Sequence, residues 1–206
     1  MKKNITLLVI LFITILSGLG QPFRNDINRF IEQDKLSPPP TNAILFIGSS
    51  SFTMWYDVRE QFPDYTIINR GFGGSTLEDL IRYVENIVYP YNPKQIVIYC
   101  GENDFASSDT ISVQIVAERF THLYHLIVIK YPDIKISYVS MKPSPSRWHL
   151  SPKFIDGNRF IKQFLEAKPN TSFINVWDKM LNSSGMPDSS IFLDDMLHMN
   201  SEGYRI

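Results

Sequence analysis

Three consecutive serines stand where the sequence changes from apolar to polar. Residues 43–55 read AILFIGSSSFTMW, so an apolar run is followed by a glycine and then by Ser49, Ser50 and Ser51. This pattern predicts a strand, a tight bend and the first turn of a helix. The start of a helix offers unpaired N–H groups and the positive end of the dipole, which stabilise an oxygen that becomes anionic. A serine at this bend is therefore either a helix cap or a nucleophile, and the stretch alone does not decide between them.

A glycine-rich loop follows the next apolar run. Residues 69–76 read NRGFGGST, with glycines at positions 71, 73 and 74 ahead of a helical pattern. Backbone N–H groups in such a loop can approach a ligand closely. A tight turn with positive φ explains the same glycines. Nucleotide binding is the weaker alternative, because the spacing matches neither G-x-G-x-x-G nor the P-loop lysine motif.

Two further polar stretches carry groups that suit nucleophilic catalysis. Asn103, in the stretch GEND after the third apolar run, either closes a turn or donates its side-chain N–H to a developing oxyanion. His198 stands three residues after Asp195, close enough for the carboxylate to fold back and fix the tautomer of the imidazole. A serine, an amide donor and an Asp-His pair together suit attack on an acyl carbonyl.

The other histidines and the cysteine predict no metal centre. His122 and His125 are three apart on a helical pattern, where we expect them to pack, and a zinc site would need a further ligand. His149 lies in the Pro/Ser loop 142–151, which is long enough to be a lid or a substrate wall. The single cysteine, Cys100, ends an apolar run and is expected to be a buried small hydrophobic residue without a disulfide.

The elements that must position these residues alternate along the chain. Runs of strand length and composition are Ala43–Ile47, Thr66–Asn69, Gln95–Cys100, Lys135–Ser140 and Ser172–Val176. Helical patterns lie between them, at Thr53–Gln61, Leu77–Val88, Val113–Lys130 and Pro152–Glu166. This alternation predicts an α/β fold with a parallel sheet covered on both faces. Ligands of such sheets bind beyond the carboxyl ends of the strands, so the polar stretches are expected to meet at one edge.

The first twenty residues have the order of a secretory signal peptide. Two lysines precede a mostly apolar run from Ile5 to Leu16, and the small residues SGLG follow. The apolar run is too short to span a bilayer comfortably. We therefore predict that residues 1–20 are a signal peptide cleaved after Gly20 and that the protein is secreted or periplasmic. An uncleaved membrane anchor is the alternative.

The rest of the chain is expected to form one domain with an N-terminal extension. Residues 21–42 predict a helix with one apolar face, followed by a connector at Pro38-Pro39-Pro40. Residues 43–206 then form the main domain. A last helix is expected to begin at Ser201, shortly before the sequence stops at Ile206, so a truncated sequence whose short last helix supports His198 poorly is one interpretation.

The charge balance argues against nucleic-acid binding. The 206 residues contain 20 Lys and Arg against 21 Asp and Glu, which leaves no basic surplus to neutralise a polyphosphate backbone. Nothing in the sequence points to an integral membrane partner, and the oligomeric state is not predicted.

The order of the polar blocks resembles that of the SGNH hydrolases, also called the GDSL esterase/lipase family. The resemblance covers about residues 43–203 and rests on FIGSSS, NRGFGGS, GEND and DMLH. It implies a three-layer α/β/α flavodoxin-like fold with a central, mostly five-stranded parallel sheet. It also implies a Ser-His-Asp hydrolase that needs no metal and no cofactor.

Carried over by position, the resemblance implies a role for each block. Ser50 is the nucleophile, and Asp195 and His198 complete the triad. The N–H groups of Ser50 and Gly74 form the oxyanion hole with the side chain of Asn103. The sequence departs from the family at Ser49, where aspartate is usual, and at position 51, where leucine or isoleucine is common, so Ser49 stays open as an alternative nucleophile.

The resemblance implies an ester substrate and leaves its identity open. Candidates are short acyl or acetyl esters, O-acetylated carbohydrate and lysophospholipid, and the side chains expected as candidates for contact with the alcohol portion are Arg70, Glu102, Arg147 and Trp148. A non-catalytic glycan- or phosphate-binding protein on the same fold is one alternative, which predicts that a member of the Ser, Asn, Asp, His set is missing. An acyltransferase using the same residues is another.

Overall fold

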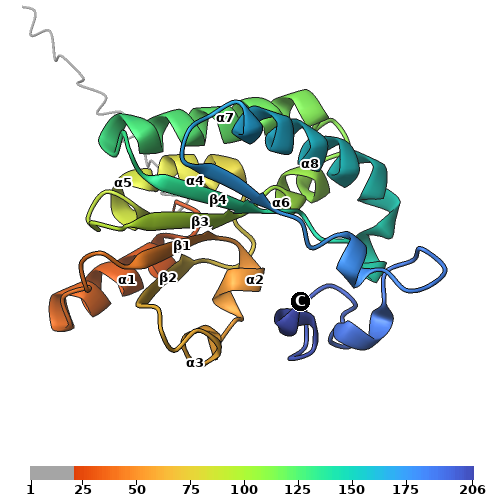
Figure 1. Ribbon diagram of the computed structural model, residues 1–206, viewed down its shortest axis with the longest axis horizontal. Helices are drawn as coiled ribbons and strands as arrows, with labels where there is room; N and C mark the ends of the chain where they lie inside the picture. Colours follow the sequence, from red (N-terminus) through yellow and green to blue (C-terminus); the bar gives the residue numbers. More distant parts are fainter. Residues whose placement is uncertain (1–20) are drawn as a thin grey trace, which may run out of the picture.

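The computed structural model describes residues 21–206 and contains one five-stranded parallel sheet. The strands are β1 Ile44–Gly48, β2 Ile67–Gly71, β3 Gln95–Tyr99, β4 Lys135–Val139 and β5 Thr171–Ile174, and their order in the sheet is β2-β1-β3-β4-β5 (Figure 1). The predicted α/β fold with a central parallel sheet is confirmed. The predicted signal peptide, residues 1–20, lies outside the described residues.

The register places the ends of three strands side by side. Gly48, the last residue of β1, pairs with Gly71 of β2 on one side and with Tyr99 of β3 on the other. The chain leaves β1 in one direction to form β2 and returns past it to form β3, so a topological switch point lies between β1 and β3. The serines, the glycine-rich loop and the GEND stretch therefore leave the sheet at one edge, as the sequence predicts.

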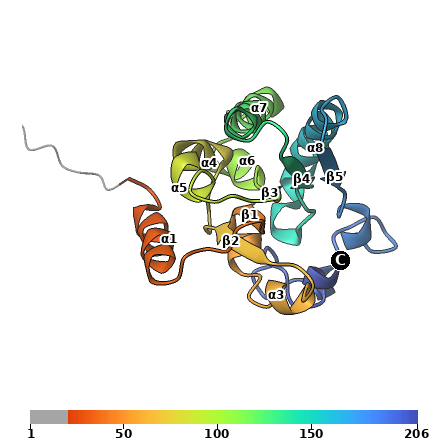
Figure 2. The same cartoon turned by 60° about the vertical axis from the view of Figure 1, so that its left-hand side comes forward.

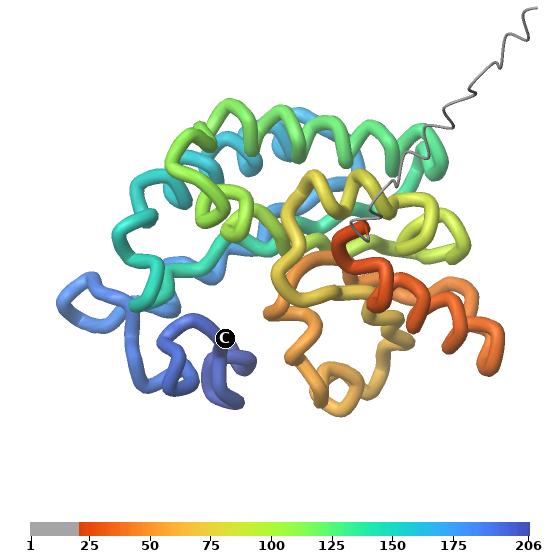
Figure 3. The backbone as a smooth tube through the Cα atoms, turned by 180° about the vertical axis from the view of Figure 1, so that it is seen from behind, coloured from red at the N-terminus to blue at the C-terminus, as the bar shows by residue number. Residues whose placement is uncertain are grey.

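The helices form two unequal layers. They are α1 Arg24–Leu36, α2 Ser50–Thr53, α3 Val58–Gln61, α4 Leu77–Arg82, α5 Val84–Ile87, α6 Glu102–Ser107, α7 Val113–Lys130 and α8 Ser151–Glu166. Helices α4 to α8 lie on one face of the sheet, whereas α2, α3 and the C-terminal segment lie on the other (Figures 1 and 2). Helix α1 runs along the edge next to β2 and contacts α5 (Figure 3).

The two faces of the sheet carry two apolar clusters. The larger joins the sheet to α4, α7 and α8 and includes the fully buried Leu45, Ile47 and Ile98. The smaller contains Phe46 and Val97, which alternate along the strands with members of the larger one, and it holds α2 through Phe52. Strands with apolar side chains on both faces are typical of a parallel sheet. None of the helices within residues 21–206 is long and apolar enough to cross a membrane.

Four predicted segments differ in the structure. The helical pattern at 77–88 forms two short helices, α4 and α5, and the pattern at 53–61 is helical only at its two ends, in α2 and α3. Trp55 stacks on Tyr204, with ring centroids 5.2 Å apart, and the Tyr83 hydroxyl donates to the Pro22 carbonyl over 2.6 Å. The GEND stretch, expected as a turn, begins the short helix α6. The helix expected from Ser201 is a 3-10 turn at Gly203–Arg205.

Candidate active site

The serine turn depends on a glycine that no other residue can replace without strain. Gly48 has a φ of 149°, and a Cβ built on it would lie 2.0 Å from the carbonyl oxygen of Tyr99. The backbone can therefore pass close to β3, where the Ser49 N–H donates to the same Tyr99 oxygen over 3.0 Å. Ser49 is extended, with φ −97° and ψ −159°, and α2 begins at Ser50. The strand-to-helix bend lies where the sequence predicts it.

The three serine hydroxyls have different surroundings. Ser49 and Ser51 are buried, whereas Ser50 is partly exposed. Ser49 Oγ accepts a hydrogen bond from Asn103, and Ser51 Oγ has no hydrogen-bond partner among residues 21–206. A Cβ built on Gly73 would lie 3.8 Å from Ser50 Cβ, so the glycine-rich loop passes directly beside Ser50. Of the three serines, Ser50 is the one whose side chain an incoming substrate can reach.

The glycine-rich loop is tied to the serine turn by hydrogen bonds. The Phe72 N–H donates to the Gly48 carbonyl over 2.9 Å, and the Ser75 hydroxyl donates to the same oxygen over 3.2 Å. Between them, Gly73 and Gly74 are exposed, and Gly74 has a φ of 85°. The loop therefore presents exposed glycine backbone next to Ser50, with the positive φ that the sequence pattern suggests.

Asn103 joins the first three blocks of the site. Its Nδ2 donates to Ser49 Oγ over 2.7 Å and to the Ser75 carbonyl over 2.9 Å. The residue stands in the first turn of α6, which begins after Gly101. The amide thus lies between the serine turn and the glycine-rich loop, although Ser49, and not Ser50, receives its hydrogen bond.

Asp195 and His198 form a hydrogen-bonded pair in the C-terminal segment. His198 Nδ1 lies 2.6 Å from Asp195 Oδ2, and Asp195 Oδ1 accepts the backbone N–H groups of Leu197 and His198 over 2.9 Å each. These bonds, led by that from the His198 ring, lower the pKa of Asp195 to about 2. An ionised carboxylate only accepts hydrogen bonds, so Nδ1 must donate, and in the neutral ring Nε2 is the acceptor nitrogen. No hydrogen bond within residues 21–206 joins this ring to Ser50.

A tyrosine that the sequence patterns did not single out fixes the C-terminal segment to α2. The Tyr204 hydroxyl donates to the Ser51 carbonyl over 2.8 Å. Burial is the main cause that raises the pKa of Tyr204 well above its usual range, so the phenol stays a donor. The C-terminal segment lies beside α2 in Figure 1, and this contact carries the Asp195–His198 loop toward the serine turn.

Two of the four residues expected as candidates for substrate contact are enclosed in internal pairs. The Arg70 side chain points to α1, where it bonds Asp34, and it lies over the Phe30 ring at 5.1 Å. The Glu102 carboxylate is buried and accepts from the Lys142 ammonium at 3.2 Å and the Lys142 N–H at 2.8 Å. The structure therefore does not bring Arg70 or Glu102 to the open side of Ser50.

The buried Glu102 carboxylate stays charged. Burial by itself raises its pKa, but the Lys142 ammonium and the hydrogen bonds from Tyr99 and the Lys142 backbone outweigh that effect and leave the pKa of Glu102 below its usual value. A buried charge of this kind needs its partner, because the low dielectric strengthens the pairing and penalises its loss.

The other two candidates lie beside the Asp195–His198 loop. Arg147 and Trp148 belong to a 3-10 helix, Pro145–Leu150, and both are partly exposed. Trp148 stacks on Trp177, with centroids 6.1 Å apart. The N–H of Ser146 in the same helix donates to the Met196 carbonyl over 3.0 Å, which ties the loop 142–151 to the Asp195–His198 loop.

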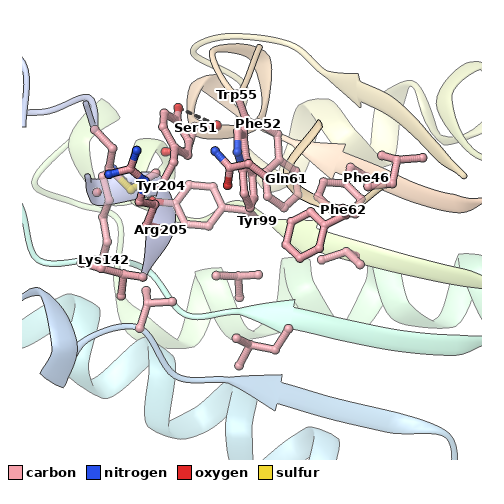
Figure 4. A pocket seen from close by; sticks show the side chains of 18 of the residues that line it. Phe46, Ser51, Phe52, Trp55, Gln61, Phe62, Tyr99, Lys142, Tyr204 and Arg205 are labelled. Carbon is pink, nitrogen blue, oxygen red and sulfur yellow. Dashed lines mark hydrogen bonds between the residues drawn. The ribbon is translucent and has the colours of Figure 1, made fainter. Parts of the chain in front are cut away.

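An apolar cavity that the sequence patterns did not reveal lies behind the serine turn. Its volume is about 900 Å³, and its aromatic lining includes Phe46, Phe52, Trp55 and Tyr99 (Figure 4). Ser51 and Met199 line it, but their neighbours Ser50 and His198 do not. The cavity is thus on the α2 face of the sheet and separate from the Ser50 side chain. Its one signal in the sequence is the apolar character of the strands on both faces.

The model of the GDSL-like lipase/acylhydrolase family matches residues 48–206. The chain belongs to this family. The match begins at the glycine that makes the serine turn and includes all four polar blocks. As a member of a family of acylhydrolases, the protein is a hydrolase that acts on esters.

Solved structures show the fold of the family in other organisms. A GDSL-like lipase from Bacteroides thetaiotaomicron is 20% identical, with 87% of this chain and 91% of that chain covered and a TM-score of 0.74. The lipase/acylhydrolase from Enterococcus faecalis is 20% identical, with 80% and 90% covered and a TM-score of 0.65. A family 3 carbohydrate esterase from Clostridium thermocellum is 16% identical, with 81% and 90% covered and a TM-score of 0.59. Comparison with curated proteins gave no match.

Proposed function

We propose that this GDSL-like hydrolase is a serine esterase in which Ser50 is the nucleophile, His198 the general base and Asp195 the residue that orients His198. The observation that carries the proposal is the 2.6 Å hydrogen bond between Asp195 and His198, in a segment that Tyr204 fixes to the helix beginning at Ser50. Because the ionised Asp195 carboxylate accepts from Nδ1, the lone pair of the neutral imidazole is on Nε2, the nitrogen that a general base uses.

The reaction follows from these groups. His198 Nε2 takes the proton of Ser50 while Ser50 Oγ attacks the ester carbonyl carbon, and the carbonyl oxygen becomes anionic. The N–H groups of Ser50 and Gly74 and the side chain of Asn103 stabilise that oxyanion. When the oxyanion collapses, the ester C–O bond breaks and the alcohol leaves with the proton from His198. Water then repeats the sequence on the acyl-enzyme, and the acid is released.

The substrate we propose is a short acyl ester, such as an acetyl ester, on a carbohydrate-like alcohol. Two observations support it. The partly exposed Trp148 stands beside the Asp195–His198 loop, where an aromatic ring suits a sugar, whereas its neighbour Arg147 lies 3.8 Å from the Glu102 carboxylate and pairs with it. The fold is also that of the Clostridium thermocellum protein described as a family 3 carbohydrate esterase. The order of residues 1–20 supports a secreted or periplasmic location.

Turnover of a chain-length series tests both parts of the proposal. The purified protein and its Ser50→Ala variant are assayed on 4-nitrophenyl acetate, butyrate and longer esters, and on acetylated xylan. We expect the acetyl ester to be preferred and the Ser50→Ala variant to retain almost no turnover. Ser51→Ala is the matched control and should keep its rate. Equal turnover by the protein and the Ser50→Ala variant would refute the catalytic assignment.

A further inference from the structure

Asn103 has no free N–H to give to an oxyanion in this structure. An amide nitrogen carries two protons, and here Nδ2 has two acceptors, Ser49 Oγ at 2.7 Å and the Ser75 carbonyl at 2.9 Å. The proposed oxyanion donor is therefore held by two protein oxygens. One of them is the hydroxyl of Ser49.

The Ser49 hydroxyl is a fixed acceptor, because the backbone that carries it is held on both sides. The Ser49 N–H donates to the Tyr99 carbonyl over 3.0 Å, and the Ser49 carbonyl accepts the N–H of Phe52 over 3.0 Å. The residue is 5% exposed. This environment does not suit a nucleophile, since substrate cannot reach a buried oxygen that already accepts a hydrogen bond.

We propose that Ser49 is a positioning residue that acts through Asn103, an inference that rests on the proposed function. In the free protein the Ser49 hydroxyl and the Ser75 carbonyl hold the amide plane so that Nδ2 faces the space beside Ser50. When the ester carbonyl becomes anionic, the charged oxygen competes with the neutral Ser49 hydroxyl for one N–H. The oxyanion prevails because a hydrogen bond to a charged acceptor is about twice as strong as one to a neutral acceptor.

The exchange works better with a hydroxyl at position 49 than with a side chain that offers no acceptor. Without Ser49 Oγ, one N–H of Asn103 has no acceptor in the free protein, so the amide is free to rotate away and must be reordered in each turnover. The loss is expected to appear in kcat, because the oxyanion exists only in the transition state and the intermediates. Substrate binding before attack does not use this N–H, so KM should change little.

A double-mutant cycle on the full chain tests the role of Ser49. The variants are Ser49→Ala, Asn103→Ala and the two combined, with turnover of 4-nitrophenyl acetate as the readout. We expect Ser49→Ala to lower kcat about tenfold with KM within about twofold, and Asn103→Ala to lower kcat about a hundredfold. If Ser49 acts through Asn103, the combined variant should be no slower than Asn103→Ala alone. Losses that multiply would overturn the proposal.

Three further variants distinguish a positioning role of Ser49 from a general loss of structure. Ser51→Ala, which removes another buried serine hydroxyl of the same turn, should leave kcat and KM within about twofold of the parent values. Ser49→Thr, which keeps a neutral hydroxyl as acceptor, should retain most of the kcat that Ser49→Ala loses. If the alanine variant fails to fold, Ser49→Cys takes its place in the cycle with the same expectations, because a thiol is a weak acceptor.

Covalent labelling distinguishes the proposal from its main rival. A fluorophosphonate probe followed by peptide mapping should modify Ser50 in the parent and in Ser49→Ala, and label on Ser49 would overturn the positioning role. The proposed function fails if Ser50→Ala keeps its turnover. The inference alone fails if Ser50→Ala is inactive while Ser49→Ala behaves like Ser51→Ala.

Discussion

The hydroxyl of Tyr204 donates a hydrogen bond to the Ser51 carbonyl over 2.8 Å, so the last turn of the described chain is anchored to the helix that begins at Ser50. The two residues are far apart in sequence, and the ring of Tyr204 also stacks on Trp55. The proposed general base and the proposed nucleophile come from opposite ends of the domain. Their relative position therefore depends on contacts of this kind.

Tyr204→Phe should weaken that anchor without removing the aromatic stack. Losing one hydrogen bond should lower the free energy of unfolding by about 1 kcal/mol. The substitution should also lower kcat a fewfold, since the segment that carries the proposed base is then held less firmly to α2. Urea unfolding and turnover of 4-nitrophenyl acetate measure the two effects. Tyr56→Phe, at an exposed position, is the control and should change neither.

Asp195→Asn should abolish most of the activity with little change in fold. The amide can no longer hold Nδ1 as a donor, so the wrong tautomer is populated, and in the serine protease example such a change costs about 10⁴ in kcat. Asp194→Asn, at the exposed neighbouring position, should keep its kcat. Comparable rates for the two variants would argue against Asp195 as the residue that orients His198.

The pH dependence of the unfolding free energy should reveal the ionisation of Asp195. The folded pKa of Asp195 is about 2, below the ordinary value of about 3.9 in an unfolded chain. A lowered folded pKa stabilises the fold above the unfolded pKa, and that contribution is lost as pH falls from about 4 to about 2. The side chain is 47% exposed, so solvent screening keeps the effect small. The difference in unfolding free energy between the parent and Asp195→Asn should be constant above pH 4 and shrink below it.

Local sequence patterns predict most of the fold and, within the candidate site, the pairing of Asp195 with His198. All five strands, α7 and α8 lie where hydrophobic periodicity placed them, within one or two residues, and the Asp195–His198 bond joins residues three apart. The contacts that were missed join distant positions. Asn103 reaches Ser49 across 54 residues and Glu102 reaches Lys142 across 40, and no periodicity in a single sequence encodes such pairs. The sequence leaves Arg70 as a candidate for substrate contact, because no local pattern reveals that its side chain pairs with Asp34 on α1.

The buried pair of Glu102 and Lys142 should behave as a unit. Glu102→Gln leaves the Lys142 ammonium, 2% exposed, without its charged partner, and should cost about 3–5 kcal/mol of unfolding free energy. Replacing Lys142 by Met in that background removes the unpaired charge and should restore part of the loss. Urea unfolding of the single and double variants measures this. A double variant no more stable than Glu102→Gln would argue against a buried pair.

Gly48→Ala should destabilise the protein strongly and should also displace the backbone of the serine turn. A methyl group at this position would lie 2.0 Å from the Tyr99 carbonyl oxygen, at a φ of 149° that side chains avoid, so β1 and β3 would have to separate. We expect a loss of at least about 3 kcal/mol in urea unfolding.

Gly185→Ala is the matched control for Gly48→Ala. Gly185 also has a positive φ, 74°, but nothing lies within 4 Å of an added Cβ, so its loss should be about 1 kcal/mol. Under conditions where the Gly48→Ala variant is folded, kcat should still fall, because Ser50 lies two residues beyond the displaced backbone. Equal losses of stability for the two alanine variants would show that the close approach of Gly48 to β3 is not what shapes the turn.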